Sequence, residues 1–313
     1  MGWRCTLYAI EMVTAVIPTY ERAATIGRAI QSVLDQSHDD LEVVVVDDAS
    51  VDKTADVVDA FESDKVRYVR LEQNVGGGGA RNVGIEHARG EYVAFLDSDD
   101  VWMPSHLEDS LRVLRGEALD GVLSSFCVDR GSGPVPFLCQ RFSPGTSMVD
   151  YILGSGGGDP RSSTMMFKRE AVSAIRFDPL LRKHQDWDLA IRFSDAFRLG
   201  VKHSPSVIMN VEREDRMSAR ANPEATQVFL DRHISSAKAP TAARTYTVLM
   251  RRALFDGGER LAYERYRKYA WTYVGAASPR ILAEMALVSV PPLARAVLKA
   301  RALLRETRSG RRQ

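Results

Sequence analysis

Residues 90–100 read GEYVAFLDSDD, a short apolar run followed directly by an aspartate-rich turn. The run 92–96 predicts a buried strand, because its apolar residues follow one another without interruption. Asp97 and Asp99 come at the end of this strand, where carboxylates can meet a ligand. Hard oxygen ligands suit Mg²⁺ or Mn²⁺, with substrate phosphates completing the coordination shell. A plain surface turn is the alternative, since Asp and Ser are common turn residues.

A glycine-rich segment precedes this strand, and residues 74–84 read NVGGGGARNVG. Successive glycines let the backbone adopt positive φ angles and approach a ligand closely. We expect a short helix at 80–89, ended by Gly90. The glycine spacing is not that of a dinucleotide-binding fingerprint. It is not a P-loop either, because Ile85 follows the last glycine where a P-loop requires lysine.

The composition excludes several classes of protein. The chain has 313 residues, 45% of them apolar, and a net charge of +1, so nucleic acid is not expected as a partner. Three scattered cysteines indicate a reducing compartment, and Arg4 and Glu11 interrupt any signal-peptide core. Uncharged runs fall short of the roughly 20 residues that span a membrane. We therefore expect a cytoplasmic protein.

The N-terminal half alternates between strand-like and helix-like segments. Strands are predicted at 12–17, 41–46, 66–71 and 92–96, with helices between them at 23–34 and 53–61. This alternation predicts an α/β fold with a parallel, doubly wound sheet. Such sheets bind ligands at the carboxyl ends of their strands. Polar residues gather at these ends: Thr19, Tyr20, Glu21, Asp47, Asp48, Asp97 and Asp99.

Four segments in this order and spacing resemble the family-2 glycosyltransferases: VIPTYER at 16–22, VVVDDAS at 44–50, NVGGGGARNVG at 74–84 and FLDSDD at 95–100. A fifth, RFDPLLRKHQDWDLAIR at 176–192, is similar to the acceptor-side motif of that family. The resemblance covers about residues 12–218. It implies the GT-A fold, with a mostly parallel sheet, and an enzyme that inverts configuration at the transferred sugar.

The resemblance also implies a domain plan. Residues 1–220 form the GT-A catalytic domain, with a nucleotide-sugar-binding half at 12–115 and an acceptor-binding half at 116–220. Residues 221–313 form a C-terminal helical extension with a basic tail. Three interpretations of the extension stay open: peripheral contact with an anionic membrane, a helical hairpin, and a homodimer interface.

By resemblance, the donor nucleotide lies at the ends of the first two strands. Asp48 accepts a hydrogen bond from the base, while Pro18, Thr19, Tyr20 and Glu21 line the same pocket. A turn or helix-capping role is the alternative for the aspartates of DDASVDKT at 47–54. We favour base binding for Asp48 and the turn role for Asp52.

The diphosphate is expected at the glycine-rich segment. Gly78 belongs to the expected binding surface, and Arg81 near a helix N-terminus suits a diphosphate. A solvated surface arginine is the alternative for Arg81.

By resemblance, Asp97 and Ser98 contact the donor, and Asp99 with Asp97 holds Mn²⁺ or Mg²⁺. The cation would stabilise the charge on the departing nucleotide. Asp100 is expected to cap the helix that begins near Pro104.

The catalytic base is expected in HQDWDL at 184–189. Inverting transfer needs a group that takes the proton from the acceptor hydroxyl, and a carboxylate suits this task. By resemblance this base is Asp186, preceded by Gln185 where the family often has Glu. Asp188 is the alternative by residue type, although it also suits the start of a helix. Residues 162–164 are expected on the strand beside the donor sugar.

Two departures from the family pattern matter. The chain lacks the Q-x-x-R-W motif of processive members after Asp186, so we expect one sugar per acceptor. Residues 211–220 read VEREDRMSAR, without the histidine that many relatives have there. Arg213 and Arg216 are candidates to contact the diphosphate instead, and acidic neighbours are candidates for the metal. We expect this segment to be a mobile lid.

Together these features predict a metal-dependent enzyme that moves one sugar from a nucleotide diphosphate sugar, a UDP-sugar by preference. The acceptor is a hydroxyl of a cell-surface glycan or of its lipid-linked precursor. The enzyme would work in the cytoplasm, at the inner face of the plasma membrane if the extension binds lipid. Transfer to polyprenyl phosphate and a non-catalytic nucleotide-binding scaffold are the alternatives.

Overall fold

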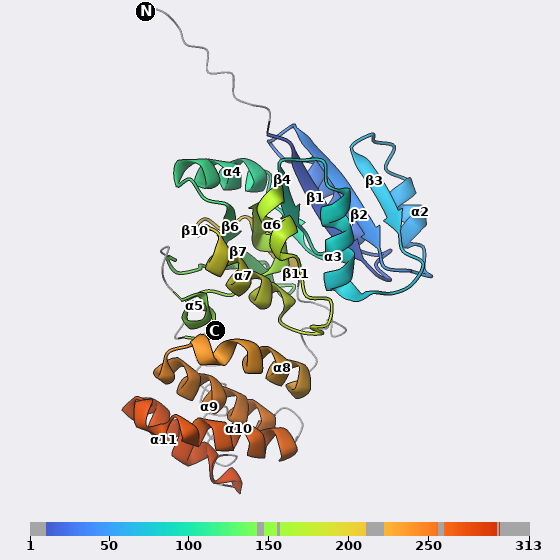
Figure 1. Cartoon of the computed structure of the whole chain (residues 1–313). Coiled ribbons are helices and arrows are strands. Elements are labelled where there is room, and N and C mark those ends of the chain that lie inside the picture. Colours follow the sequence, from blue (N-terminus) through green and yellow to red (C-terminus); the bar gives the residue numbers. More distant parts are fainter. Residues whose placement is uncertain are drawn as a thin grey trace, which may run out of the picture. The chain divides into compact units, whose positions relative to one another are not determined.

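Figure 1 shows a computed structural model of the chain. The structure describes residues 11–142, 147–154, 157–210, 222–255, 260–292 and 294. It forms two compact units, which are Met1–Met148 with Gly157–Phe229, and Val149–Gly156 with Leu230–Gln313. The predicted domain boundary at residue 220 lies outside the described residues and stays a prediction.

The first unit contains a seven-stranded sheet in the order β10-β6-β9-β4-β1-β2-β3. Its strands are β1 (Val13–Thr19), β2 (Leu41–Asp47), β3 (Val66–Arg70), β4 (Tyr92–Phe95), β6 (Gly121–Ser124), β9 (Met165–Lys168) and β10 (Leu199–Lys202). Neighbouring strands are parallel, except that β9 runs antiparallel to β4 and β6. The predicted α/β class with a mostly parallel sheet is confirmed.

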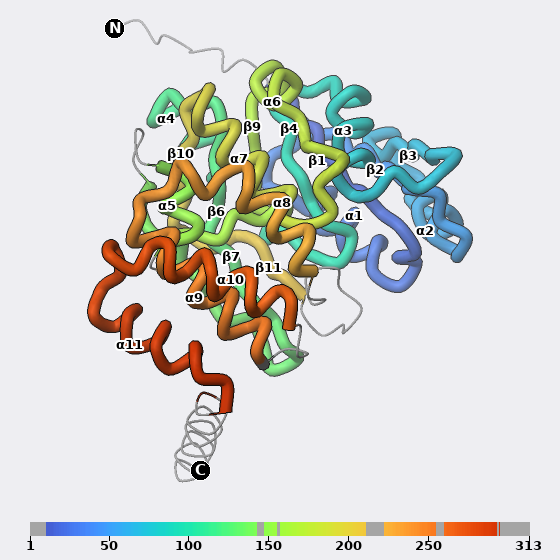
Figure 2. Tube along the Cα trace, turned by 60° about the horizontal axis from the view of Figure 1, so that its bottom comes forward, coloured from blue at the N-terminus to red at the C-terminus, as the bar shows by residue number. Residues whose placement is uncertain are grey.

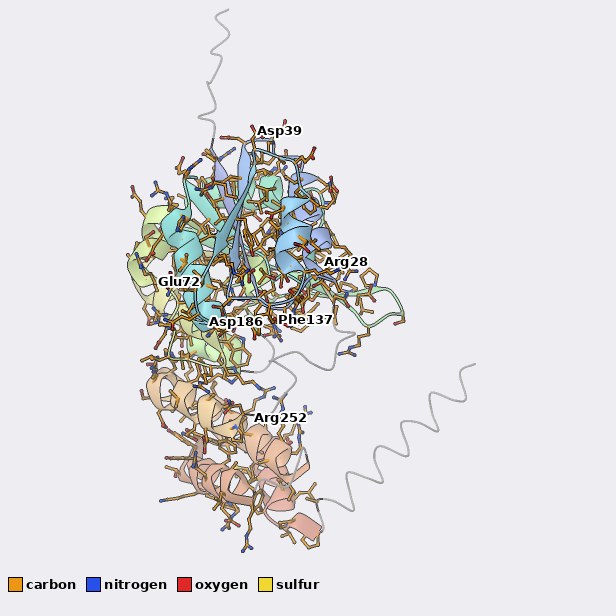
Figure 3. All side chains as sticks on the ribbon, turned by 90° about the vertical axis from the view of Figure 1, so that its right-hand side faces the viewer. Arg28, Asp39, Glu72, Phe137, Asp186 and Arg252 are labelled. Carbon is orange, nitrogen blue, oxygen red and sulfur yellow. The ribbon has the colours of Figure 1, made fainter. Side chains whose placement is uncertain are left out.

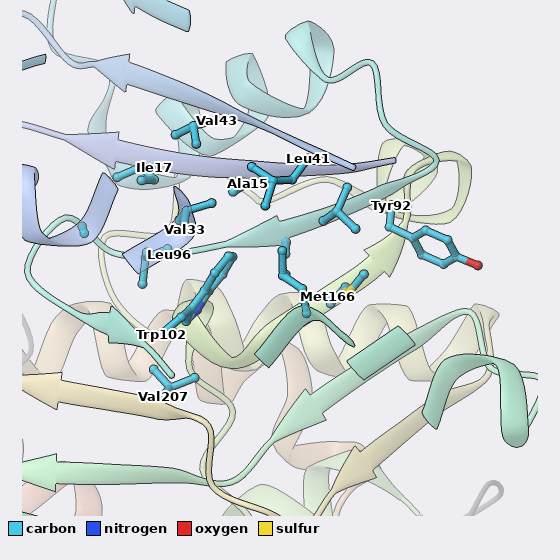
Figure 4. Packing of buried hydrophobic residues seen from close by; sticks show 14 of the residues in the cluster. Ala15, Ile17, Val33, Leu41, Val43, Tyr92, Leu96, Trp102, Met166 and Val207 are labelled. Carbon is cyan, nitrogen blue, oxygen red and sulfur yellow. The ribbon is translucent and has the colours of Figure 1, made fainter. Parts of the chain in front are cut away.

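The valine run of β2 explains why the sheet carries helices on both faces. Val43 and Val45 join the large core cluster that includes α1 (Ile26–Leu34), part of which Figure 4 shows. Val44 and Val46 pack instead with Ala80 of α3 (Gly76–His87). Successive side chains of a strand point to opposite faces, so a continuous apolar run requires cover on each.

A second, four-stranded sheet follows the aspartate-rich turn. Its order is β5-β11-β7-β8. The strands are β5 (Val101–Trp102), β7 (Phe126–Asp129), β8 (Pro134–Phe137) and β11 (Val207–Asn210). Trp102 is buried, and its indole N–H donates to the Ser163 carbonyl at 2.8 Å. This bond ties the strand after the turn to the segment before β9.

Helices complete both units (Figures 1 and 2). The first unit also contains α2 (Thr54–Asp59), α4 (His106–Gly116), α6 (Arg169–Ile175), α7 (Gln185–Ala196) and the residues of α8 (Pro223–His233) up to Phe229. The second unit contains residues of α5 (Met148–Leu153), together with α9 (Ala239–Phe255), α10 (Arg260–Thr272) and α11 (Pro279–Val288). None of the helices in the described ranges is long and apolar enough to cross a membrane.

Aromatic residues connect helices within the second unit. Tyr246 of α9 stacks on Tyr269 of α10 at 5.0 Å between ring centroids. The Tyr263 hydroxyl donates to the Val288 carbonyl of α11 at 3.0 Å. α9 therefore packs against a neighbour that is itself bonded to α11.

The helix predicted at 80–89 begins earlier than expected, because α3 starts at Gly76, within the glycine-rich segment. Glycine has a low helix propensity, but tertiary contacts override it here. The Asp48 carboxylate accepts hydrogen bonds from the backbone N–H groups of Val75 and Gly76, at 2.7 and 2.9 Å. The glycines also permit close packing, since a Cβ at Gly84 would lie 2.1 Å from Val16 Cγ1 of β1.

We expect Gly84→Ala to destabilise the protein by about 1–3 kcal/mol, because the added methyl group forces α3 away from β1. Gly116→Ala is the matched control. A Cβ at Gly116 meets no atom within 4 Å, so this variant should be neutral or slightly stabilising. Urea unfolding of both variants measures the difference. An unfolding midpoint of Gly84→Ala equal to that of the wild type would disprove the close packing.

Lys202 of β10 is buried, and no carboxylate of the described residues forms an ion pair with it. Its ammonium donates to Ser206 Oγ at 2.8 Å and to the His106 carbonyl at 3.3 Å. Burial lowers the pKa of Lys202 to about 8, which the Asp109 charge partly opposes and the Arg112 charge reinforces. The folded protein therefore holds this proton less tightly than the unfolded chain does.

The free energy of unfolding should consequently rise with pH between about 8 and 10.5. Lys202→Met removes this contribution. We expect the stability of Lys202→Met relative to the wild type to fall by about 3 kcal/mol from pH 7 to pH 10.5. Urea unfolding across this range measures the difference. A difference that does not change with pH would contradict the lowered pKa.

Candidate active site

The aspartate-rich turn lies at the carboxyl end of β4. The Asp97 side chain is 38% exposed and Asp99 is partly exposed, whereas Ser98 and Asp100 are buried. Ser163 fixes the turn: its hydroxyl accepts the Asp97 N–H at 3.0 Å and donates to Asp100 at 2.7 Å. The two carboxylates predicted to bind a cation are thus the accessible ones.

The sequence predicted that Asp100 caps the following helix, but it does not. Its second carboxylate oxygen accepts the Asn210 N–H at 3.2 Å, so both oxygens are occupied. The helix α4 begins at His106, and Ser105 stands at its N-cap. Asp100 instead joins the turn to β11 and to the segment before β9.

Residues 162–164 also differ from the prediction, because they form a 3₁₀ turn and β9 begins at Met165. The Thr164 hydroxyl closes this turn by donating to the Arg161 carbonyl at 2.8 Å. The turn still borders the predicted donor site, since Ser163 holds Asp97.

Arg81 on α3 is buried rather than a solvated surface arginine. Only 9% of the residue is exposed, and its guanidinium forms an ion pair with Asp97 at 2.5 Å. The guanidinium also lies over the Phe177 ring, 5.3 Å from the centroid. The Arg81 Nε is buried without a hydrogen-bond partner. A charge held in this way next to the aspartate turn suits an anionic ligand.

Gly78 brings the start of α3 against the start of α7. A Cβ at Gly78 would lie 3.0 Å from the Gln185 amide nitrogen. A larger residue at this position would therefore displace Gln185, the neighbour of Asp186. Glycine is needed here for packing against the predicted base helix, whatever ligand also approaches it.

The end of β1 carries four of the predicted nucleotide-binding residues. Pro18 and Thr19 are buried, and the Thr19 hydroxyl oxygen has no hydrogen-bond partner among the residues that the structure describes. Tyr20 is exposed, so its ring is available to a ligand. The Glu21 carboxylate accepts the Val51 N–H at 2.9 Å and so holds the loop after β2. Glu21 therefore contributes to the predicted nucleotide site by holding this loop in place.

Asp48 stands at the end of β2 and is buried. Base binding and capping were the two interpretations of Asp48, and its carboxylate accepts hydrogen bonds from the backbone N–H groups of Val75 and Gly76 at the start of α3. Each carboxylate oxygen can accept a further hydrogen bond, so base binding stays a prediction. Asp52 accepts the Thr54 N–H at 3.0 Å, which confirms its turn role.

Asp186 is the second residue of α7, and Figure 3 labels it. Its side chain is partly exposed, and one oxygen accepts the Trp187 N–H at 2.9 Å. Enough protein surrounds the carboxyl that burial raises its pKa from 3.8 to about 6. The charge of Arg161 opposes this rise, that of Asp159 adds to it, and that of Arg81 opposes it more weakly. A pKa near neutral suits a general base.

Asp188 is engaged elsewhere. Its side chain is fully buried, and one oxygen accepts two hydrogen bonds from Arg192, at 2.8 and 2.6 Å. The same guanidinium donates to the carbonyls of Ile175 and Arg176. Asp188 therefore anchors α7 to the end of α6, which favours Asp186 over Asp188 as the base.

The cation ligands can be tested against the donor set. Among the described residues, no group of three or more His, Cys, Asp or Glu side chains gathers. Asp97 and Asp99 offer hard carboxylate oxygens, although one oxygen of Asp97 is paired with Arg81. Two carboxylates fit Mg²⁺ or Mn²⁺ when waters and substrate phosphates supply the remaining ligands.

Residues 14–176 match the model of a family described as "Glycosyl transferase family 2". The match contains the glycine-rich segment, Arg81 and the aspartate-rich turn. The chain belongs to glycosyl transferase family 2.

The chain is similar to named glycosyltransferases of bacteria. It is 34% identical over 201 residues to the amylovoran biosynthesis glycosyltransferase AmsB of Erwinia amylovora, an alignment that covers 60% of this chain and 65% of that protein. It is 28% identical over 121 residues to WfaP of Escherichia coli, named a UDP-Glc:alpha-D-GlcNAc-diphosphoundecaprenol beta-1,3-glucosyltransferase, with 39% and 48% covered. The chain thus spans about two-thirds of the first relative's length and about half of the second's.

The chain also shares its fold with a solved structure. The crystal structure of S. aureus TarS 1–349 in complex with UDP-GlcNAc superposes with a TM-score of 0.62 and 22% identity, covering 96% of this chain and 92% of that one. The predicted family and the predicted GT-A fold with a helical C-terminal region are confirmed.

Two charged residues near Asp186 were not predicted from the sequence. Asp159 accepts the Trp187 indole N–H at 3.1 Å and forms an ion pair with Arg161 at 2.5 Å. The sequence offered a weak signal, because a D-P-R triplet directly precedes residues 162–164. Nothing in the spacing indicated that it faces a residue so far along the chain.

Trp187 stacks on His184 at 4.8 Å and meets Phe229 edge-on at 5.9 Å. It therefore belongs to an aromatic cluster. The predicted lid at 211–220, with Arg213 and Arg216, lies outside the described residues.

Proposed function

We propose that the protein is an inverting, non-processive glycosyltransferase that uses a UDP-sugar. It would move one sugar to a hydroxyl of a cell-surface glycan or of its lipid-linked precursor. One observation carries the proposal. Asp186, with a pKa near 6, follows Gln185, which packs on Gly78 of α3. Arg81 of the same helix pairs with Asp97. Donor-side and base-side groups thus belong to one connected set of contacts.

The donor would lie along the ends of β1, β2 and β4. Tyr20 is free to cover the base, and Asp48 and the buried Thr19 hydroxyl supply acceptors at the same edge. Arg81 and Ser98 would face the diphosphate and ribose. The names of WfaP and of the TarS complex support a UDP-sugar as the donor.

A divalent cation, Mn²⁺ or Mg²⁺, would be held by Asp99 and by the Asp97 oxygen that Arg81 does not occupy. When bound, such a cation neutralises negative charge on the diphosphate. Arg81 would then compensate the remaining charge from the opposite side, because it is already positioned by Asp97 and Phe177.

Asp186 would take the proton from the acceptor hydroxyl as the oxygen attacks the anomeric carbon. The bond from that carbon to the nucleotide diphosphate breaks at the same time, so the sugar is transferred with inversion. Only the ionised carboxylate can accept the proton, so activity should fall as pH drops through about 6.

The remaining parts of the chain follow the same plan. Residues 12–115 would serve the donor, and 116–220 the acceptor. The helical extension at 221–313 would bring the enzyme to a lipid surface at the inner face of the plasma membrane, or pair two copies. Its basic sequence supports the first of these.

A transfer assay tests the proposal. The purified chain is incubated with a panel of UDP-sugars, Mn²⁺ and diphosphate-linked GlcNAc lipid or polyprenyl phosphate as acceptor, and NMR reads the configuration of the product. We expect transfer from one UDP-sugar, with an α-linked donor giving a β-linked product. Retention of configuration would disprove the mechanism. UDP binding without transfer to either acceptor would favour the scaffold interpretation.

A further inference from the structure

The segment 159–164 touches both sides of the proposed site. Ser163 binds Asp97 and Asp100 of the donor turn, as described above. At its other end, Asp159 binds Arg161 and the Trp187 indole. A single stretch of backbone thus connects the metal-binding turn with the base helix, although it belongs to neither.

Asp159 and Asp186 share one neighbour. Trp187 donates its backbone N–H to Asp186 at 2.9 Å and its indole N–H to Asp159 at 3.1 Å. Asp159 and Asp186 repel each other when both are charged, and this repulsion raises the pKa of Asp186. A cation near the pair is needed to offset this repulsion.

Arg161 is the cation in that position. Its Nη2 contacts Asp159 at 2.5 Å, while its Nε is buried without a hydrogen-bond partner. The side chain is 38% exposed, and its charge acts on Asp186 as well as on Asp159. Its backbone is fixed, because the Thr164 hydroxyl donates to the Arg161 carbonyl.

Arg81 cannot substitute for Arg161 in this role. Arg81 is committed to Asp97 and, under the proposed function, to the donor diphosphate. The Arg161 charge opposes the raised pKa of Asp186 more than the Arg81 charge does.

We propose that Arg161, held by Asp159, is a positioning residue that keeps the Asp186 carboxylate ionised so that it can act as the base. This inference rests on the proposed function, since it assigns a partner to the proposed base. It adds a charge balance in which Arg161 favours ionisation of Asp186 and Asp159 opposes it.

The charge balance predicts opposite effects for two variants. Arg161→Gln removes the favourable charge, so the pKa of Asp186 should rise by about one unit. Asp159→Asn removes the opposing charge and keeps an acceptor for the Trp187 indole, so the pKa of Asp186 should fall. Arg161→Lys keeps the charge and should restore the wild-type value.

The test is an NMR titration of the free protein, labelled with ¹³C at the aspartate carboxyl groups and kept in chelator. Asp186→Asn assigns the Asp186 signal. Arg112→Gln is the matched control, because Arg112 pairs with Glu108 and Asp109 on the surface of α4. Shifts of opposite sign in Arg161→Gln and Asp159→Asn, with none in the control, would support the proposal.

An Asp186 titration that moves in neither variant, or moves the same way in both, would overturn it. A variant that only loosened the fold would not produce opposite shifts, and the titration midpoint does not depend on the folded fraction. Transfer assays separate the two levels of inference. If Asp186→Asn retains wild-type transfer, the proposed base is wrong. If transfer depends on Asp186 but the pKa of Asp186 is the same in the Arg161 and Asp159 variants as in the wild type, only the positioning role fails.

Discussion

Asp186→Asn should lower kcat/KM for sugar transfer by a factor of about 10²–10⁴, the usual contribution of a general base. Asparagine has nearly the same shape and keeps an oxygen for the Trp187 N–H, but it cannot take the acceptor proton. UDP binding should be unchanged, because no donor contact is assigned to this side chain. Steady-state kinetics and calorimetric titration with UDP measure the two effects.

The same substitution should stabilise the protein at alkaline pH. The folded pKa of Asp186, about 6, lies above its ordinary value of 3.8, so the folded protein binds this proton more tightly than the unfolded chain. The bound proton stabilises the folded wild type fully below pH 3.8, and this stabilisation of the wild type is lost as pH rises through 6. At pH 8 we expect Asp186→Asn to be up to about 3 kcal/mol more stable than the wild type, with no gain at pH 4.

Asp188→Asn is the control for both effects. It disrupts the buried pair with Arg192 and should cost stability at every pH from 6 to 8. The folded fraction should still transfer sugar. Loss of transfer in folded Asp188→Asn, together with an active Asp186→Asn, would mean that the two roles have been exchanged.

Asp99→Asn should weaken cation-dependent UDP binding on the order of 100-fold. Asp99 is a more direct probe of the cation than Asp97, because loss of Asp97 would also release Arg81 from its ion pair. In chelator, the wild type and Asp99→Asn should bind UDP equally weakly. Calorimetric titrations with Mn²⁺ and with chelator give both comparisons.

Asp56→Asn, an exposed residue of α2, is the matched control and should behave as the wild type. Undiminished UDP binding by Asp99→Asn in Mn²⁺ would rule out Asp99 as a cation ligand. Wild-type binding that does not change between Mn²⁺ and chelator would rule out the cation itself.

Local patterns predicted the sheet well because burial dictates them. The valine run of β2 must be covered on both faces, and it is. The start of α3 escaped prediction because it depends on distant groups. Asp48 accepts hydrogen bonds from the first N–H groups of the helix, and Val16 leaves no room for a side chain at Gly84. Neither residue adjoins the segment in sequence.

The candidate site shows the same division. Asp97, Asp99 and Asp186 could be predicted because each stands at the end of a strand or the start of a helix within a family motif. Asp159 and Arg161 were missed because their significance comes only from contact with Trp187 and proximity to Asp186. Charge balance around a base depends on spatial neighbours, which spacing along the chain does not reveal.

Thermal unfolding of the wild type against nucleotides tests the donor site most directly. The panel contains UDP, GDP, ADP and several UDP-sugars, each with Mn²⁺, with Mg²⁺ and with chelator. A ligand at 100 times its Kd stabilises the folded state by about 2.7 kcal/mol. We expect UDP and at least one UDP-sugar to raise the Tm, and to do so only with a cation. No rise with any nucleotide, or an equal rise in chelator, would contradict a cation-dependent UDP-sugar site.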